Sequence, residues 1–193
     1  SDSDTPRKVR VQVVPGPATI VRSTQISFSG TNAEDPSGRG MREGIRRDLE
    51  RFNGERFSQS AWSNAKNEGV RRLQNRRYPT ASLVDSRADI DADLNEAELR
   101  MDYAPGPAYS FGPLVIQGAE RYNPAGLIRL ARLPVGEEYR QTTLLETQQR
   151  LANSGYYDSV FLTLDTDGTS VYTGTVDILH EGKVVDTTQI RVQ

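Results

Sequence analysis

Few residues of this chain have the types and spacing that chemistry requires. The 193-residue sequence has no cysteine, so it offers no thiolate nucleophile, no disulfide and no thiolate metal ligand. His180 is the single histidine, and no spaced set of carboxylates accompanies it as a metal site would require. No Gly-x-Ser-x-Gly motif, phosphate-binding loop or dinucleotide fingerprint is present, and no carboxylate pair indicates acid–base catalysis. We therefore predict that the protein is not an enzyme and uses no metal and no cofactor.

One basic cluster has the chemistry of an anion site. It consists of Arg71, Arg72, Arg76 and Arg77. Such a cluster could hold a phosphate or a lipid headgroup. Acidic residues lie nearby in the sequence, among them Glu68 and the stretch 89–98. Mixed charge runs usually form a solvated helix face, so we favour that interpretation and keep the anion site as the alternative.

The charge and the apolar pattern argue against nucleic acid as a partner and against a membrane-spanning helix in this sequence. A formal net charge of −2 gives no global field that would attract nucleic acid or an anionic membrane. No apolar run reaches the roughly 20 residues of a membrane-spanning helix, and there is no signal-peptide pattern. The polar start SDSDTPRK leads directly into a predicted strand, 9–14. We therefore expect a fragment whose targeting and membrane segments lie outside this sequence.

The hydrophobic patterns in the first half predict the order strand, helix, helix, strand, strand. Period-2 alternation predicts strands, and apolar residues at helical spacing predict helices. Ser58 is the expected N-cap of the second helix. The predicted elements are strand 20–29, loop 31–40, helix 41–52, helix 59–74, strand 80–84, acidic connection 85–95 and strand 97–103.

The second half predicts the same order. Pro124, after the capping residue Asn123, is a strong helix start. The predicted elements are strand 109–117, a helix from Pro124, helix 143–153, and strands 157–164 and 170–179 with a turn across 165–168. We expect the first of these helices to turn Leu127, Ile128, Ala131 and Leu133 inward, and the second to carry Leu144, Leu145 and Leu151. The tail 180–193 is ambiguous, although parts of it could add strand.

Three sequence blocks occur twice. Residues 9–30 are similar to 97–118, each with a Pro-Gly-Pro break between two strands. NGERFSQS at 53–60 is similar to VGEEYRQT at 135–142, and LQNRRYPTASLV at 73–84 to LANSGYYDSVFL at 151–162. Self-similarity at a fixed period indicates a tandem array of one small unit. Such arrays usually function by presenting surfaces.

These blocks resemble POTRA domains, the periplasmic modules of outer-membrane assembly proteins of the BamA/TamA type. The resemblance rests on the repeated element order, the entries Gly54–Phe57 and Gly136–Tyr139 to the second helices, the segment Arg150–Val160 and the run Pro105–Gly112. It is closest to TamA, the translocation and assembly module. It implies an α+β fold of tandem β-α-α-β-β modules, each a three-stranded mixed sheet with two helices on one face. The implied boundaries are a closing strand and linker at 1–17, one module at 18–105 and another at 106–193.

The resemblance also assigns structural roles. The motif residues are Pro105, Gly106, Pro107, Gly136, Tyr139, Gly155, Tyr156 and Tyr157. Gly155 is expected to end the helix in the left-handed conformation, and a following tyrosine to fill the space between helix and sheet. The first copy departs from this pattern, with Arg76-Arg77-Tyr78-Pro79 where the second has its Gly-Tyr turn.

The resemblance further implies binding by strand addition at sheet edges. The expected edge strands are Thr80, Ala81, Ser82, Leu83 and Val84 in the first module, and Ser159, Val160, Phe161, Leu162 and Thr163 in the second. The alternative is that these strands only complete their modules, because edges are ordinarily protected.

The implied location is the periplasm of a Gram-negative bacterium, in an outer-membrane protein with a C-terminal barrel in cis. The implied partners are unfolded outer-membrane or autotransporter polypeptides and an accessory envelope protein of the TamB type. Three alternatives stay open: a BamA-like insertase or secretion pore, a structural or scaffold POTRA-type docking module with no client-insertion role, and a small RNA-binding module. The balanced charge argues against the last.

Overall fold

The computed structural model describes residue 12 and residues 16–112, 114–117, 124–155, 172–180 and 183–192. Several predictions fall outside these residues. They are the strand 9–14 apart from residue 12, most of the segment 1–17, the cap Asn123, the turn residues Tyr156 and Tyr157, the strand 157–164 with its edge residues Ser159 to Thr163, and the turn 165–168.

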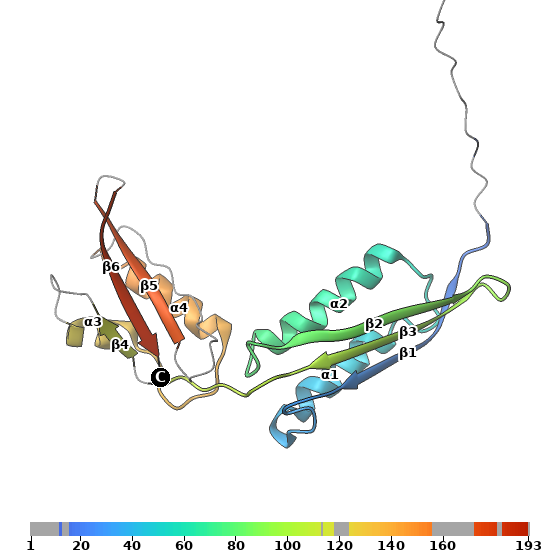
Figure 1. Ribbon diagram of the computed structural model, residues 1–193, viewed down its shortest axis with the longest axis horizontal. Coiled ribbons are helices and arrows are strands. Elements are labelled where there is room, and N and C mark those ends of the chain that lie inside the picture. The colour runs from blue at the N-terminus through green and yellow to red at the C-terminus, as the bar shows by residue number, and fades with distance from the viewer. Residues whose placement is uncertain are drawn as a thin grey trace, which may run out of the picture.

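The first unit is a mixed three-stranded sheet with two long helices. Its elements are β1 (Ile20–Phe28), the short 3-10 helix η1 (Pro36–Gly38), α1 (Arg39–Glu50), α2 (Gln59–Gln74), β2 (Ser82–Asp91) and β3 (Glu96–Ala104). The strand order is β1-β3-β2, in which β3 pairs parallel with β1 and antiparallel with β2 (Figure 1). The element order and the mixed sheet expected for this half are therefore confirmed.

Both helices cover one face of this sheet, because the buried residues of β3 alternate along the strand. They are Ala97, Leu99, Met101 and Tyr103. The same core contains Ile45 and Leu49 of α1 and Trp62, Ala65 and Leu73 of α2, together with Val21, Tyr78 and Ala81. Ser58 caps α2 as expected, since its hydroxyl accepts the N–H of Ala61 at 3.4 Å.

The prediction of an acidic connection at 85–95 is wrong, because β2 continues to Asp91 and a hairpin joins it to β3. The charged residues of β2 lie on the uncovered face of the sheet, where they stay hydrated. The half-buried Ser86 and Ala88 occupy the covered face. The turn forms because the Asp91 carboxylate accepts the backbone N–H groups of Asp93 at 2.9 Å and Leu94 at 3.0 Å.

The second unit has the described elements β4 (Leu114–Gln117), α3 (Pro124–Ala131), α4 (Gln141–Ala152), β5 (Tyr172–His180) and β6 (Lys183–Val192). The strand order is β4-β6-β5, and both described pairings are antiparallel, which differs from the mixed order expected for this half (Figure 1). The ambiguous tail contains β6. Leu127, Ala131 and Leu151 are buried as expected, whereas Ile128 is 42% exposed and Leu145 53% exposed.

The described part of the chain gives no sign of a metal centre or a membrane-spanning helix. Within it, no group of three or more histidine, cysteine, aspartate or glutamate residues could hold a metal ion. No described helix has both the length and the apolar character needed to cross a bilayer.

Candidate functional site

A short segment pairs with the first strand region in the same way in both units. In the first unit, Gly54 N–H donates to the Val21 carbonyl at 2.8 Å, and Val21 N–H donates to Glu55 at 2.9 Å. In the second unit, Gly136 N–H donates to the Phe111 carbonyl at 2.6 Å, and Phe111 N–H donates to Glu137 at 2.9 Å. The two repeated sequence blocks around these glycines therefore form the same backbone structure.

The backbone conformation favours glycine at the start of both segments. Gly54 has φ 85° and Gly136 has φ 86°, and residues other than glycine rarely adopt this backbone conformation. Phe57 N–H donates to the Thr19 carbonyl at 2.8 Å, and the equivalent Tyr139 N–H donates to Tyr109 at 3.0 Å. Tyr109 to Phe111 pair in this way, so the predicted strand 109–117 is divided. Of its residues, only those of β4 lie in the second sheet.

These bonds cover part of one edge of the first sheet and leave the other edge without a partner strand among the described residues. Residues 54–57 pair with residues 19–21, at the very start of β1, whereas β2 pairs with β3 alone among the described strands. The structure places Ser82, Leu83 and Val84 at the start of β2, and Thr80 and Ala81 before it, with Ala81 buried. A register shift between Leu83 and Asp85 bends this end of the edge. The regular part of the free edge therefore begins at Asp85.

The turn that follows α2 joins the two units through three backbone hydrogen bonds. Arg77 N–H donates to the Tyr139 carbonyl at 2.9 Å, and Tyr109 N–H donates to the Arg77 carbonyl at 2.8 Å. Gln141 N–H donates to Asn75 at 2.9 Å. We call residues 75–77, 109 and 138–141 the joint.

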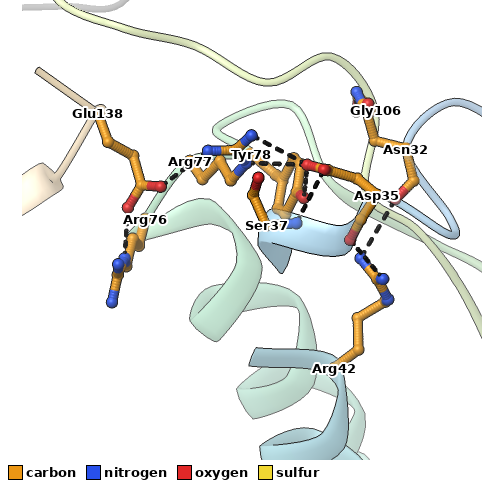
Figure 2. A network of polar contacts seen from close by, with 9 residues as sticks. All are labelled: Asn32, Asp35, Ser37, Arg42, Arg76, Arg77, Tyr78, Gly106 and Glu138. Carbon is orange, nitrogen blue, oxygen red and sulfur yellow. Dashed lines mark hydrogen bonds and ion pairs between the residues drawn. The ribbon is translucent and has the colours of Figure 1, made fainter. Parts of the chain in front are cut away.

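Ion pairs reinforce the joint (Figure 2). Glu138 accepts from Arg76 Nε at 2.5 Å and from Arg77 Nη1 at 2.9 Å. The other edge of the Arg77 guanidinium contacts Asp35 Oδ2, at 3.0 Å from Nη2. Arg77 therefore links the loop before α1 to the second unit, and its side chain is 21% exposed.

Asp35 organises the first-unit side of this network (Figure 2). It accepts the Tyr78 hydroxyl at 2.8 Å and the Ser37 N–H at 3.0 Å, and the Asp35 carbonyl accepts Arg42 Nη2 at 2.6 Å. The Tyr78 and Ser37 hydrogen bonds, with the nearby Arg77 charge, lower the pKa of Asp35. The carboxylate is therefore fully ionised at neutral pH.

Glu138 and Arg77 stay charged for the same reason. Burial opposes the charged form of Glu138, but hydrogen bonds from Arg76 and Arg77 outweigh it and lower the pKa of this carboxyl. Burial also opposes the charged form of Arg77, yet Glu138, Tyr78 and Asp35 together raise the pKa of the guanidinium. The joint therefore contains a charged group on both sides at physiological pH.

The sequence interpretation of the arginine cluster was partly wrong. Arg71 pairs with Glu68 on the exposed surface of α2, as a solvated helix face predicts. Arg72 pairs with Asp48 of α1, and Arg76 and Arg77 belong to the joint. Each cation of the cluster thus has a carboxylate partner, which argues against an anion site. The departure from the Gly-Tyr turn was the signal that could have identified the joint.

The proline-glycine linker between the units is packed against the first unit. Pro105 is fully buried, and the Gly106 carbonyl accepts the Asn32 side-chain amide at 2.8 Å (Figure 2). Gly106 has φ 75°, and a Cβ there would lie 2.7 Å from the Thr80 hydroxyl oxygen. The left-handed conformation expected for Gly155 is also present, with φ 73°. Tyr139 is buried, and the centroid of its ring lies 5.7 Å from the centroid of the Phe111 ring.

Comparisons with known proteins agree with this architecture. The POTRA family model, described as a surface antigen variable number repeat, matches residues 109–179. No curated protein sequence matches the chain. Among solved structures, the Haemophilus influenzae BamA POTRA3-5 crystal structure is similar with a TM-score of 0.53 and 19% identity. Haemophilus ducreyi BamA lacking POTRA domains 1-3 is similar with a TM-score of 0.56 and 15% identity.

Each comparison covers 78% of this chain, which spans 56% of the first BamA chain and 27% of the second. Identities this low establish the fold alone. The chain therefore has the α+β fold of POTRA domains, and the part that matches the family model lies in its second unit.

Proposed function

We propose that this chain is part of a jointed periplasmic arm of an outer-membrane assembly protein, and that it binds extended polypeptides by strand addition at β2. On this proposal 18–105 and 106–193 are consecutive POTRA modules, and residues 1–17 close a preceding one. The clients are unfolded outer-membrane or autotransporter polypeptides, the accessory partner is of the TamB type, and the membrane barrel follows in cis. The similarity to BamA POTRA domains supports this assignment.

The free edge of β2 is the observation that carries the proposal. An edge strand presents a row of unpaired N–H and C=O groups, which an extended chain can pair with regardless of its sequence. The opposite edge is occupied at its start, because residues in the segment Gly54 to Phe57 already bond to Thr19 and Val21. Only β3 pairs with β2 among the described strands.

Adjacent proline substitutions in β2 test strand addition. In an antiparallel edge strand, successive N–H groups point alternately to the partner strand and to the free edge. Of Arg87→Pro and Ala88→Pro, one therefore removes an N–H that bonds β3 and lowers the unfolding temperature. The other removes an N–H on the free edge, and we expect it to keep the fold and to lose capture of an extended peptide as long as β2.

Circular dichroism melts identify which variant is which, and fluorescence anisotropy measures capture. If the folded variant binds the peptide as tightly as the original chain, strand addition at β2 is wrong.

The joint favours the second candidate, a scaffold module that only spaces other domains, because three backbone hydrogen bonds and the Glu138 ion pairs fix the two units together. A scaffold would bind no extended peptide in any variant.

A further inference from the structure

The register of β2 on β3 places like charges directly opposite one another. Asp85 faces Asp102, Asp89 faces Glu98, and Asp91 faces Glu96. All six carboxylates lie on the uncovered face of the sheet. Three of them alternate along β3 with the buried residues of that strand, and the other three are paired with these in β2. Like charges directly opposite in a sheet are destabilising, so this arrangement has an energetic cost that folding alone does not explain.

Arginines compensate only part of this charge. Arg87 pairs with Asp89 at 2.5 Å, Arg22 with Glu96 at 3.4 Å, and Arg100 with Glu98 at 3.8 Å. The other three carboxylates have no arginine partner among the described residues, and Asp102 instead accepts the hydroxyls of Ser27 and Ser29. Six carboxylates and three guanidinium groups give this face a formal charge of −3, beside a free backbone edge.

The covered face of β2 has a different character. Ser86, Ala88 and Ile90 lie on this side, because they face the buried residues Met101, Leu99 and Ala97 of β3. Ile90 is still 52% exposed, near the end of the hairpin. A strand added beside β2 would therefore have one row of side chains next to the carboxylates and the alternate row next to small and apolar residues.

We propose that the β2 edge selects extended segments in which lysine or arginine alternates with apolar residues. The basic row lies beside Asp85, Asp89 and Asp91, and the apolar row extends the covered face at Ala88 and Ile90. This inference rests on strand addition at β2 and adds a sequence preference to it. The backbone supplies affinity, and the carboxylates supply discrimination.

Synthetic peptides of the length of β2 test the preference. One alternates lysine with valine, the second alternates glutamate with valine, and the third is the lysine peptide N-methylated at alternate residues. We expect the lysine peptide to bind at least about tenfold more tightly than the glutamate peptide, since several exposed charge pairs contribute together. The preference should weaken as salt rises from low to high ionic strength.

Substitutions identify the responsible carboxylates. The double variant Asp85→Asn, Asp89→Asn should reduce the preference to about threefold or less, because it removes two of the three carboxylates of β2. The double variant Glu50→Gln, Glu146→Gln makes the same change in net charge on exposed helix positions, and it should keep the preference. Equal loss in both variants would show a general charge effect and overturn the assignment to β2.

The N-methylated peptide separates this inference from the function on which it rests. Methylation removes the N–H groups that strand addition needs and keeps the charge. If it binds as well as its parent, strand addition itself is wrong. If it fails to bind while the lysine and glutamate peptides bind equally, strand addition stands and the charge preference is overturned.

Discussion

Arg77 has the left-handed backbone conformation that Gly155 has in the second unit. The two positions are equivalent, since each lies four residues after a buried leucine, Leu73 or Leu151. Arg77 has φ 67° and Gly155 φ 73°. A left-handed conformation costs a residue other than glycine roughly 1–2 kcal/mol. At Arg77 the contacts with Asp35 and Glu138 offset that cost, so the side chain is retained for the joint rather than for the turn.

Gly69 shows the opposite case, in which the absence of a side chain is needed. Glycine within a helix is unfavourable by about 0.5–1 kcal/mol relative to alanine. A Cβ at Gly69 would contact the buried Tyr103 ring, at 2.6 Å from Cζ, whereas a Cβ at Gly44 of α1 meets nothing within 4 Å. The sequence shows the helix cost at Gly69, and only the structure shows why it is accepted.

We therefore predict opposite effects for two similar substitutions. Gly69→Ala should lower the free energy of unfolding by about 1–3 kcal/mol, because the added methyl group overpacks the core against Tyr103. Gly44→Ala should raise it by up to about 1 kcal/mol through helix propensity. Urea unfolding followed by circular dichroism measures both. A stabilising Gly69→Ala would contradict the close packing of position 69 against Tyr103.

At the scale of elements, local patterns predicted the helices better than the strands. The bounds of α2 were predicted correctly because its apolar spacing and the cap at Ser58 are both local signals. The strand β2 was predicted too short because Asp85, Asp89 and Asp91 resemble a polar connection, and only the pairing with β3 makes them strand residues. The joint was not predicted, because Arg77 and Glu138 lie far apart in the sequence and no local pattern connects them.

The glycine-led segment that covers β1 is the element whose role is easiest to test. A Cβ at Gly54 would meet nothing within 4 Å, so Gly54→Ala costs only the strain of φ 85°. We expect a loss of roughly 1–2 kcal/mol in the free energy of unfolding and faster amide hydrogen exchange at Val21, whose N–H bonds Glu55. Gly16→Ala, equally open but without positive φ, is the control and should change neither quantity.

For the whole molecule, the joint determines how the two units are held. Backbone hydrogen bonds contribute only about 0.5–1.5 kcal/mol each, so three of them leave the orientation sensitive to the side chains around them. Glu138 provides both ion pairs from the second unit, to Arg76 and Arg77. Loss of this one carboxylate should therefore loosen the joint and leave each unit folded.

Double electron–electron resonance measures this directly, because the chain has no cysteine and spin labels can be placed at exposed Gln25 and Gln149 alone. Glu138→Gln should broaden the distribution of distances between the two labels. Glu137→Gln removes an exposed neighbouring carboxylate and should leave the distribution unchanged. Similar broadening in both variants would mean that the Glu138 ion pairs do not hold the joint.

Acid should reproduce the effect of Glu138→Gln, and the direction follows from the pKa values. The pKa of Glu138 is lowered from its ordinary 4.5 and that of Asp35 from 3.8. A depressed carboxyl pKa stabilises the joint fully above the ordinary value and loses that contribution as pH falls through the lowered one. The distance distribution should therefore be the same at pH 7 and pH 5.5 and broaden below about pH 4. Broadening between pH 7 and pH 5.5 would contradict this, because the joint contains no histidine and no carboxyl in it titrates there.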